Sequence, residues 1–170
     1  MGFWRLAART VIGGLFIGHG TQKLKGWFDG PGLDGTEQMM KSLKMEPARE
    51  NALLAGATET VGGGLLVAGL ATPIASAALI GTMITAIRKV HLAKGPWNSD
   101  GGYEYNLVLI ASLLELAASG PGKYSLDRLL HTERPGFAPA ATAFLLGAGA
   151  STAAIAVGGW MAEAETDAPS

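Results

Sequence analysis

Residues 51–70 read NALLAGATETVGGGLLVAGL, an apolar stretch that carries one acidic residue, Glu59, near its centre. A transmembrane helix needs about 20 mostly apolar residues. An ionisable side chain at that depth costs about 3 kcal/mol or more, so it normally faces a partner or a cavity. The stretch therefore predicts a membrane-spanning helix whose Glu59 points into the protein.

Four further apolar stretches predict helices at about residues 4–23, 73–90, 105–119 and 138–161, and none alternates as a strand does. The fold class is therefore predicted to be all-α. We expect an integral membrane four-helix bundle over residues 1–136, an additional C-terminal transmembrane helix over 137–161 and an acidic disordered tail over 162–170. Two short helices are also predicted, one at 36–44 capped by Thr36 and one at 125–131 with Ser125 as its cap and Asp127 against its dipole.

Composition and net charge limit the classes of function and of partner to consider. The 170 residues suffice for one domain, and 48% of them are hydrophobic against 16% charged. The net charge of −1 gives no reason to expect a nucleic-acid partner, whereas the apolar stretches predict a lipid bilayer around the protein. The chain has no cysteine, which excludes disulfides, thiolate metal sites and iron–sulfur ligation.

Small residues recur at intervals of four on three of the predicted helices. Such stripes let helix backbones approach closely in a membrane, so they predict the packing faces. The stripes are Gly14 and Gly18 on the first helix, Gly56, Thr60, Gly64 and Ala68 on the second, and Ala143, Gly147 and Ser151 on the fifth.

Polar residues gather where four predicted helix ends meet. Because successive helices alternate in direction, the end of the first and third helices and the start of the second and fourth lie on one side. We predict a ligand-binding site there, formed by His19, Lys23, Glu59, Arg88, His91, Tyr103, Glu104 and Asn106. The spacing of the histidines and acids predicts no metal site, and no covalently bound cofactor is expected.

Several of these side chains have two interpretations. Glu59 is either a proton-accepting, ligand-facing carboxylate or the structural ion-pair partner of Lys23 or Arg88. Lys23 either binds a ligand or extends to the lipid headgroups. Glu115 is expected to be buried, protonated and hydrogen-bonded locally, and the alternative is a proton path from Glu59.

The same residues resemble the DoxX family of integral membrane proteins over residues 6–130. The resemblance rests on Gly18-His19-Gly20 followed by Lys23, on the run from Glu59 to Gly64, on Tyr103-Glu104-Tyr105-Asn106, and on Gly120-Pro121-Gly122 before Ser125-Leu126-Asp127. The resemblance implies a four-helix membrane protein, and the predicted fifth helix is an addition to that pattern. Relatives include membrane subunits of archaeal thiosulfate:quinone oxidoreductase and actinobacterial partners of superoxide dismutase and a sulfurtransferase.

Three function classes are consistent with this pattern. The first, which we favour, is a multi-pass plasma-membrane subunit of a redox system in oxidative-stress or sulfur metabolism that interacts with quinone, with soluble redox enzymes or with both. The second is a non-catalytic anchor or scaffold for soluble antioxidant enzymes. The third is a small-solute or proton pathway through Glu59 and Glu115. Assembly into a homo-oligomer or with other membrane subunits is also expected.

Overall fold

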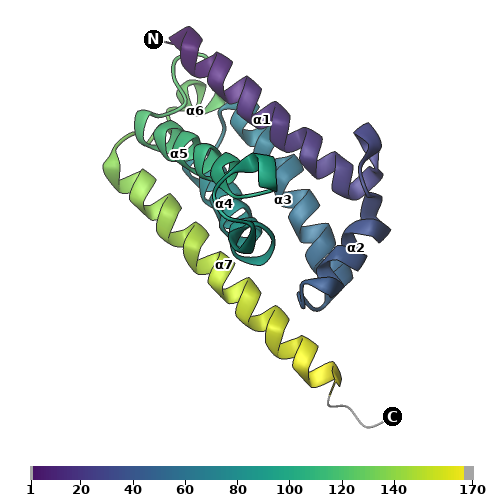
Figure 1. The fold of residues 1–170 in the computed structure, drawn as a ribbon. Coiled ribbons are helices and arrows are strands. Elements are labelled where there is room, and N and C mark those ends of the chain that lie inside the picture. Colours follow the sequence, from purple (N-terminus) through teal and green to yellow (C-terminus); the bar gives the residue numbers. More distant parts are fainter. Residues whose placement is uncertain (1, 167–170) are drawn as a thin grey trace.

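The computed structural model describes residues 2–166, which are helical with no strand among them (Figure 1). The long helices are α1 (Gly2–Lys25), α3 (Ala48–Ala68), α4 (Thr72–Ala86), α5 (Glu104–Ser119) and α7 (Phe137–Thr166). Two short helices, α2 (Gly32–Ser42) and α6 (Leu126–Leu129), lie in connections. All five long helices predicted from the sequence are present, with ends within about four residues of the expected ones except at the end of α7.

α7 runs to Thr166, so the first part of the segment expected to be a disordered tail is helical. The other tail residues, 167–170, lie outside the described part of the chain. At the start of α4, Pro73 occupies the first turn, where its missing N–H costs nothing. At the end of α3, Gly69 has a φ of 63° and closes the helix, as glycine commonly does.

α1 and α3 form an antiparallel pair that packs through glycine. A side-chain carbon added to Gly13 would lie 2.5 Å from the Gly63 carbonyl oxygen, and one added to Gly20 would lie 2.6 Å from that of Gly56. Both separations are far shorter than van der Waals contact, so only hydrogen fits at this interface. The predicted Gly56 stripe is thus confirmed at Gly56, whereas Gly14, Gly18 and Gly64 face open space and were wrongly assigned to the interface.

α7 packs along α4 through the stripe that the sequence predicted. Ala143 and Ser151 are buried, and Gly147 approaches the backbone of Ala77 and Gly81. The Thr85 hydroxyl donates a hydrogen bond to Ser151 Oγ at 2.9 Å. The fifth helix is therefore an integral wall of the structure. Its C-terminal half also reaches the α2–α3 connection, where the Glu46 N–H donates to the Gly158 carbonyl at 3.3 Å.

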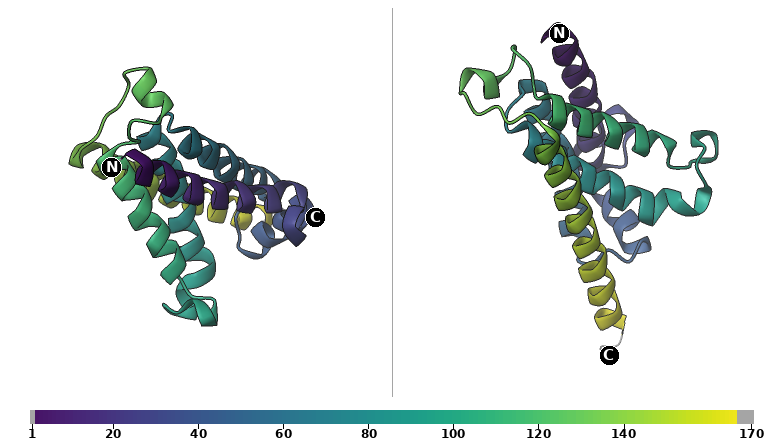
Figure 2. Two further views of the ribbon diagram at one scale, coloured as in Figure 1. Left: turned by 90° about the horizontal axis from the view of Figure 1, so that it is seen from above. Right: turned by 90° about the vertical axis from the view of Figure 1, so that its left-hand side faces the viewer.

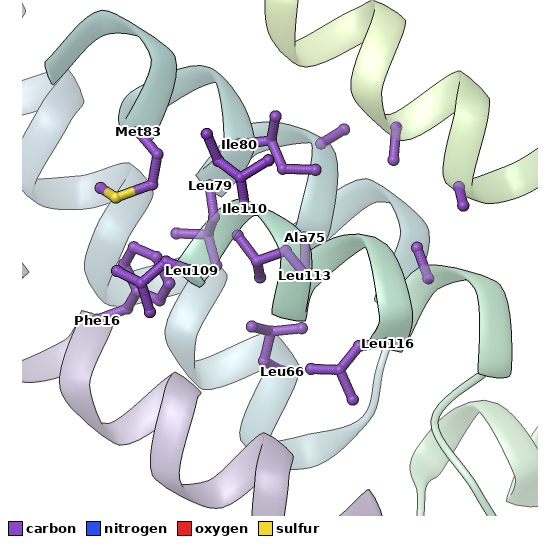
Figure 3. Packing of buried hydrophobic residues seen from close by; sticks show 14 residues of the cluster. Phe16, Leu66, Ala75, Leu79, Ile80, Met83, Leu109, Ile110, Leu113 and Leu116 are labelled. Atoms are coloured by element: carbon purple, nitrogen blue, oxygen red, sulfur yellow. The ribbon is translucent and has the colours of Figure 1, made fainter. Parts of the chain in front are cut away.

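The main core lies between α3, α4 and α5, with α1 and α7 covering its two sides (Figure 3). Its largest members are Phe16, Leu66, Leu79, Ile80, Leu113 and Leu116. A smaller cluster of Met40, Met45, Ala48 and Ala52 packs against Ala154 and Ile155 of α7. The α4–α5 hairpin crosses the α1–α3 pair steeply, so its connection projects to one side and the helices do not form an upright parallel bundle (Figure 2).

Two described segments are long and apolar enough to cross a membrane, Thr72–Lys94 and Phe137–Glu165. α1 and α3 have the length, 24 and 21 residues or about 36 and 31 Å, but are less apolar than these two segments. α5 has 16 residues, about 24 Å, which is short of a hydrocarbon core of about 30 Å. A membrane arrangement of four helices plus one therefore stays a prediction.

One end of the fold is held by two buried charges. The Arg9 guanidinium donates to the Leu66 and Val67 carbonyls at 3.1 and 3.0 Å, and also to the Tyr124 carbonyl. Asp127 accepts from the N–H groups of Ala71 and Thr72 at 2.8 and 3.1 Å, so it caps α4. Asp127 also lies in the first turn of its own short helix, where the sequence placed it, while its cap of α4 was not predicted.

The Ser125 cap of α6 is confirmed, because its Oγ accepts from the Arg128 N–H at 3.2 Å. Thr36 is not a cap. It is buried inside α2, and its hydroxyl donates to the Gly32 carbonyl at 2.7 Å and to the Lys23 carbonyl at 3.2 Å, which ties α2 to the end of α1.

The position of α7 predicts a specific cross-link. Because the natural chain has no cysteine and the Thr85 and Ser151 oxygens are 2.9 Å apart, the double variant Thr85→Cys/Ser151→Cys should oxidise to an intramolecular disulfide. Counting free thiols with a maleimide after denaturation checks this. The control pair Thr85→Cys/Ala153→Cys, with the second cysteine on the exposed face of α7, should keep both thiols. Two free thiols in both variants would show that α7 lies elsewhere.

The Asp127 cap predicts a pH-dependent stability. Burial alone would raise the pKa of Asp127, but hydrogen bonds from Thr72, Ala71 and Thr132 outweigh it and hold the pKa below its ordinary 3.8. A carboxyl whose pKa is depressed by folding stabilises the fold above the unfolded-state pKa and loses that effect as pH falls through the folded value. Asp127→Asn should therefore lower stability by about 2 kcal/mol at pH 7.

Thermal unfolding in detergent at pH 7 and pH 3 measures the effect. The difference between the natural chain and Asp127→Asn should shrink at the lower pH, while Asp100→Asn on an exposed turn should change neither value. An Asp127→Asn penalty that is the same at both pH values would contradict the role assigned to the carboxylate.

Candidate functional site

A cavity of about 510 Å³ lies where the α1–α3 pair and the α4–α5 hairpin diverge. This volume is within the range of small-molecule sites, about 300–1,000 Å³. The cavity is bounded by the second half of α1, by α2, by the first half of α3, by the end of α4, by the start of α5 and by Ala150, Ser151 and Ala154 of α7. Its wall is mainly apolar, and four of the chain's six methionines contribute to it: Met39, Met40, Met45 and Met83.

The polar centre of this wall is an ion pair between α1 and α3. Lys23 Nζ lies 2.6 Å from Glu59 Oε2, and the Glu59 side chain is 3% exposed against 22% for Lys23. A carboxylate so buried requires a partner, whereas the longer lysine side chain still reaches toward solvent or headgroups. The predicted pairing of Glu59 with Lys23 is thus confirmed. Glu59 also lines the cavity, so the structural and ligand-facing interpretations both apply to it.

Of the eight predicted site residues, five line the cavity: His19, Lys23, Glu59, His91 and Asn106. The His91 ring nitrogen Nδ1 is 2.7 Å from the Gly101 carbonyl oxygen and donates to it, which fixes the ring over the α4–α5 connection. Asn106 is 7% exposed, and its amide donates to the Met83 sulfur at 3.4 Å.

The other three predicted residues lie outside the cavity wall. Arg88 donates to Thr152 Oγ1 of α7 at 3.0 Å, so it is not the ion-pair partner of Glu59. Glu104 accepts from the Asn98 N–H at 2.8 Å. Tyr103 precedes α5, and Tyr105 lines the cavity in its place.

Arg88 lies off the cavity-facing side of α4. The residues on that side follow one another at intervals of three or four, namely Ala78, Thr82, Thr85 and Lys89, so Lys89 rather than Arg88 lines the wall. Residues 87–91 form a π-helical turn, η2 (Ile87–His91), at the end of α4, and His91 lines the wall from this turn.

The predicted burial of Glu115 is also wrong. This residue was expected to be buried and is exposed on α5, away from the cavity. The two serines of α5 donate to backbone carbonyls rather than to Glu115, Ser112 to Val108 at 2.8 Å and Ser119 to Gly120 at 3.4 Å. A proton path from Glu59 to Glu115 has no connecting group in the described structure.

Sequence reasoning missed the methionine wall and the α7 contribution. The signal for the first was present, because Met39 and Met40 lie on the apolar side of the predicted 36–44 helix. The Thr85–Ser151 hydrogen bond could not be anticipated, since nothing in the sequence says which helix faces α7.

Comparisons with known proteins identify the family. A model of the DoxX family matches residues 4–92. The Bacillus subtilis (strain 168) protein named "Putative oxidoreductase CatD" is 32% identical over 122 residues, which cover 72% of this chain and 83% of that protein. No solved structure shows a significant match. The chain belongs to the DoxX family, which is membrane-associated.

The ion pair predicts an asymmetric response to substitution. Lys23→Met leaves Glu59 buried and unpaired, which should cost on the order of 3 kcal/mol of stability. Glu59→Gln leaves a lysine that can extend outward, so it should cost less. The double variant Lys23→Met/Glu59→Gln should recover part of the loss of Lys23→Met.

The measurement is thermal stability in detergent, read as the fraction of protein that stays monodisperse after heating. Lys25→Met, on an exposed position of the same helix, is the matched control and should behave like the natural chain. Equal losses in Lys23→Met and Glu59→Gln, with simple addition in the double variant, would mean that the two side chains do not interact.

Proposed function

We propose that this protein is a multi-pass plasma-membrane subunit of a redox system, and that its cavity binds the headgroup of a quinone. The observation that carries the proposal is the cavity itself, with an apolar wall and a small set of polar groups around Lys23 and Glu59. A DoxX relative named as an oxidoreductase supports the redox role.

Exposed apolar side chains support a multi-pass arrangement. They occur on α1, α3 and α5 as well as on the two segments that are apolar enough to span. The exposed aliphatic side chains on these three helices are Val11, Leu15, Leu53, Leu54, Val61, Leu107 and Val108. Aromatic residues are exposed near helix ends and in connections, namely Trp4, Trp27, Trp97, Phe137 and Trp160, as interfacial belts require. Such surfaces favour lipid on every side of the protein.

The chemistry of the wall supports a quinone-class ligand. A quinone combines a polar ring with an apolar tail, and the cavity combines His19, Lys23, Tyr105 and Glu59 with methionine, leucine and alanine side chains. Reduction or oxidation of such a ring needs groups that exchange protons, and histidine and glutamate are suited to that task. The residues supply binding and proton exchange, while the electron donor or acceptor belongs to a partner.

The alternative functions differ in what they require. A non-catalytic scaffold for soluble antioxidant enzymes needs a polar docking surface, and the exposed charges of α2 and α3, where Arg49 pairs with Asp34 and Glu37, offer one. A proton pathway loses support because Glu115 is exposed and unconnected to the cavity. Soluble redox enzymes and other membrane subunits stay compatible with the quinone proposal as partners.

Binding of a short-chain benzoquinone to the purified protein tests the proposal. We expect saturable binding in the micromolar range that weakens about three- to tenfold in His19→Ala and in Lys23→Ala, since each loses a donor to the quinone carbonyls. His19 makes no hydrogen bond to a described residue, so its variant should fold normally.

The matched control is Lys25→Ala, which removes an exposed lysine of α1 that does not line the cavity. It should bind like the natural chain. Absence of binding at concentrations well above micromolar would end the quinone proposal and leave the scaffold as the better account.

A further inference from the structure

The charges at the centre of the cavity are already balanced. Lys23 is held by Glu59 at 2.6 Å, so an anionic ligand would have to displace a buried carboxylate from its cation. Lys89 also lines the cavity, but it belongs to η2, six residues and about 9 Å along α4 from Met83. The deep part of the site therefore suits an uncharged ligand.

Two buried side chains there have spare acceptor capacity. Glu59 uses Oε2 for Lys23, and its other oxygen, Oε1, accepts no hydrogen bond from any residue between 2 and 166. Asn106 donates to the Met83 sulfur, while its carbonyl oxygen has no donor among the same residues. Both side chains line the cavity and are more than nine-tenths buried. Neither oxygen is sealed off from the cavity, so a ligand can reach both. A ligand that displaces water from these oxygens keeps their hydrogen bonds only if it donates in turn, so each oxygen favours a ligand that donates.

A quinone cannot meet this demand, because its ring offers only carbonyl acceptors. Its reduced form, a hydroquinone, is equally uncharged and of nearly the same shape, and carries two hydroxyl donors. We propose that the cavity binds the hydroquinone in preference to the quinone, with Glu59 accepting a hydrogen bond from one hydroxyl group and Asn106 available to the same ring. This rests on the proposed quinone-class function and assigns the redox form that the site retains.

Three ligands of one shape separate the donor effect from the apolar fit. A short-chain benzohydroquinone, its dimethyl ether and the corresponding benzoquinone are compared by equilibrium dialysis against the purified protein without oxygen. The hydroquinone should bind about tenfold or more tightly than either of the others, the ratio expected for one hydrogen bond to a charged acceptor.

Glu59→Gln tests the acceptor, because an amide donates as well as accepts. The tenfold ratio should fall to about threefold or less in this variant, with quinone binding unchanged or tighter, and should persist in Glu115→Gln, an exposed acid of α5. If Glu59→Gln does not fold, Lys23→Met/Glu59→Gln, which leaves no lone charge, takes its place. If neither variant folds, the ranking on the natural chain decides alone.

The outcomes are distinct. Equal or tighter binding of the quinone or the dimethyl ether by the natural chain overturns the preference and leaves the quinone-class site intact. No binding of any of the three overturns both. A hydroquinone preference that survives loss of the Glu59 carboxylate overturns the assignment of the acceptor.

Discussion

The close approach of α1 to α3 is the contact on which the candidate site depends. Gly13 and Gly20 meet Gly63 and Gly56 so closely that a methyl group on Gly13, Gly20 or Gly63 would strike the opposite backbone, and one on Gly56 would strike the Leu24 side chain. Lipid supplies no hydrophobic force to bring two helices together, so such pairs rely on packing and on polar bonds between them. The lysine and the glutamate of the ion pair lie within one helical turn of this contact. A wider spacing would leave the acid buried without its cation.

The opposite end of the molecule explains why the cavity lies where it does. The Arg9 guanidinium joins α1 to the end of α3 and to the segment before α6, and Asp127 of α6 joins that helix to the start of α4. The helices are therefore tied together at one end and diverge toward the other, where the α4–α5 hairpin turns away from the α1–α3 pair (Figure 2). α7 spans both regions and closes the side that the divergence would leave open.

Helix positions and the central ion pair could be predicted from the sequence, because apolar length and an isolated buried acid are local signals. Orientation about each helix axis could not. In a soluble helix the polar face marks the outside, but in a membrane protein both faces are apolar, and so Glu115 was placed inside when it is outside. The run Gly62–Gly63–Gly64 offers three faces to a partner, and only the structure shows that Gly63 is used against α1. The same uncertainty placed Arg88 in the site, whereas Lys89 continues the side of α4 that lines the cavity.

The methionines of the cavity wall make it adaptable. An unbranched thioether chain has several accessible rotamers and a polarisable sulfur, so it can fill irregular space without movement of the backbone. Four such side chains around one cavity form a lining that adapts to ligands of different shape. Ring substituents and tail length should then matter little to recognition. Ligands are then discriminated by the few polar atoms between α1, α3 and α5. The site therefore tolerates ligands of different shape but requires specific hydrogen bonds.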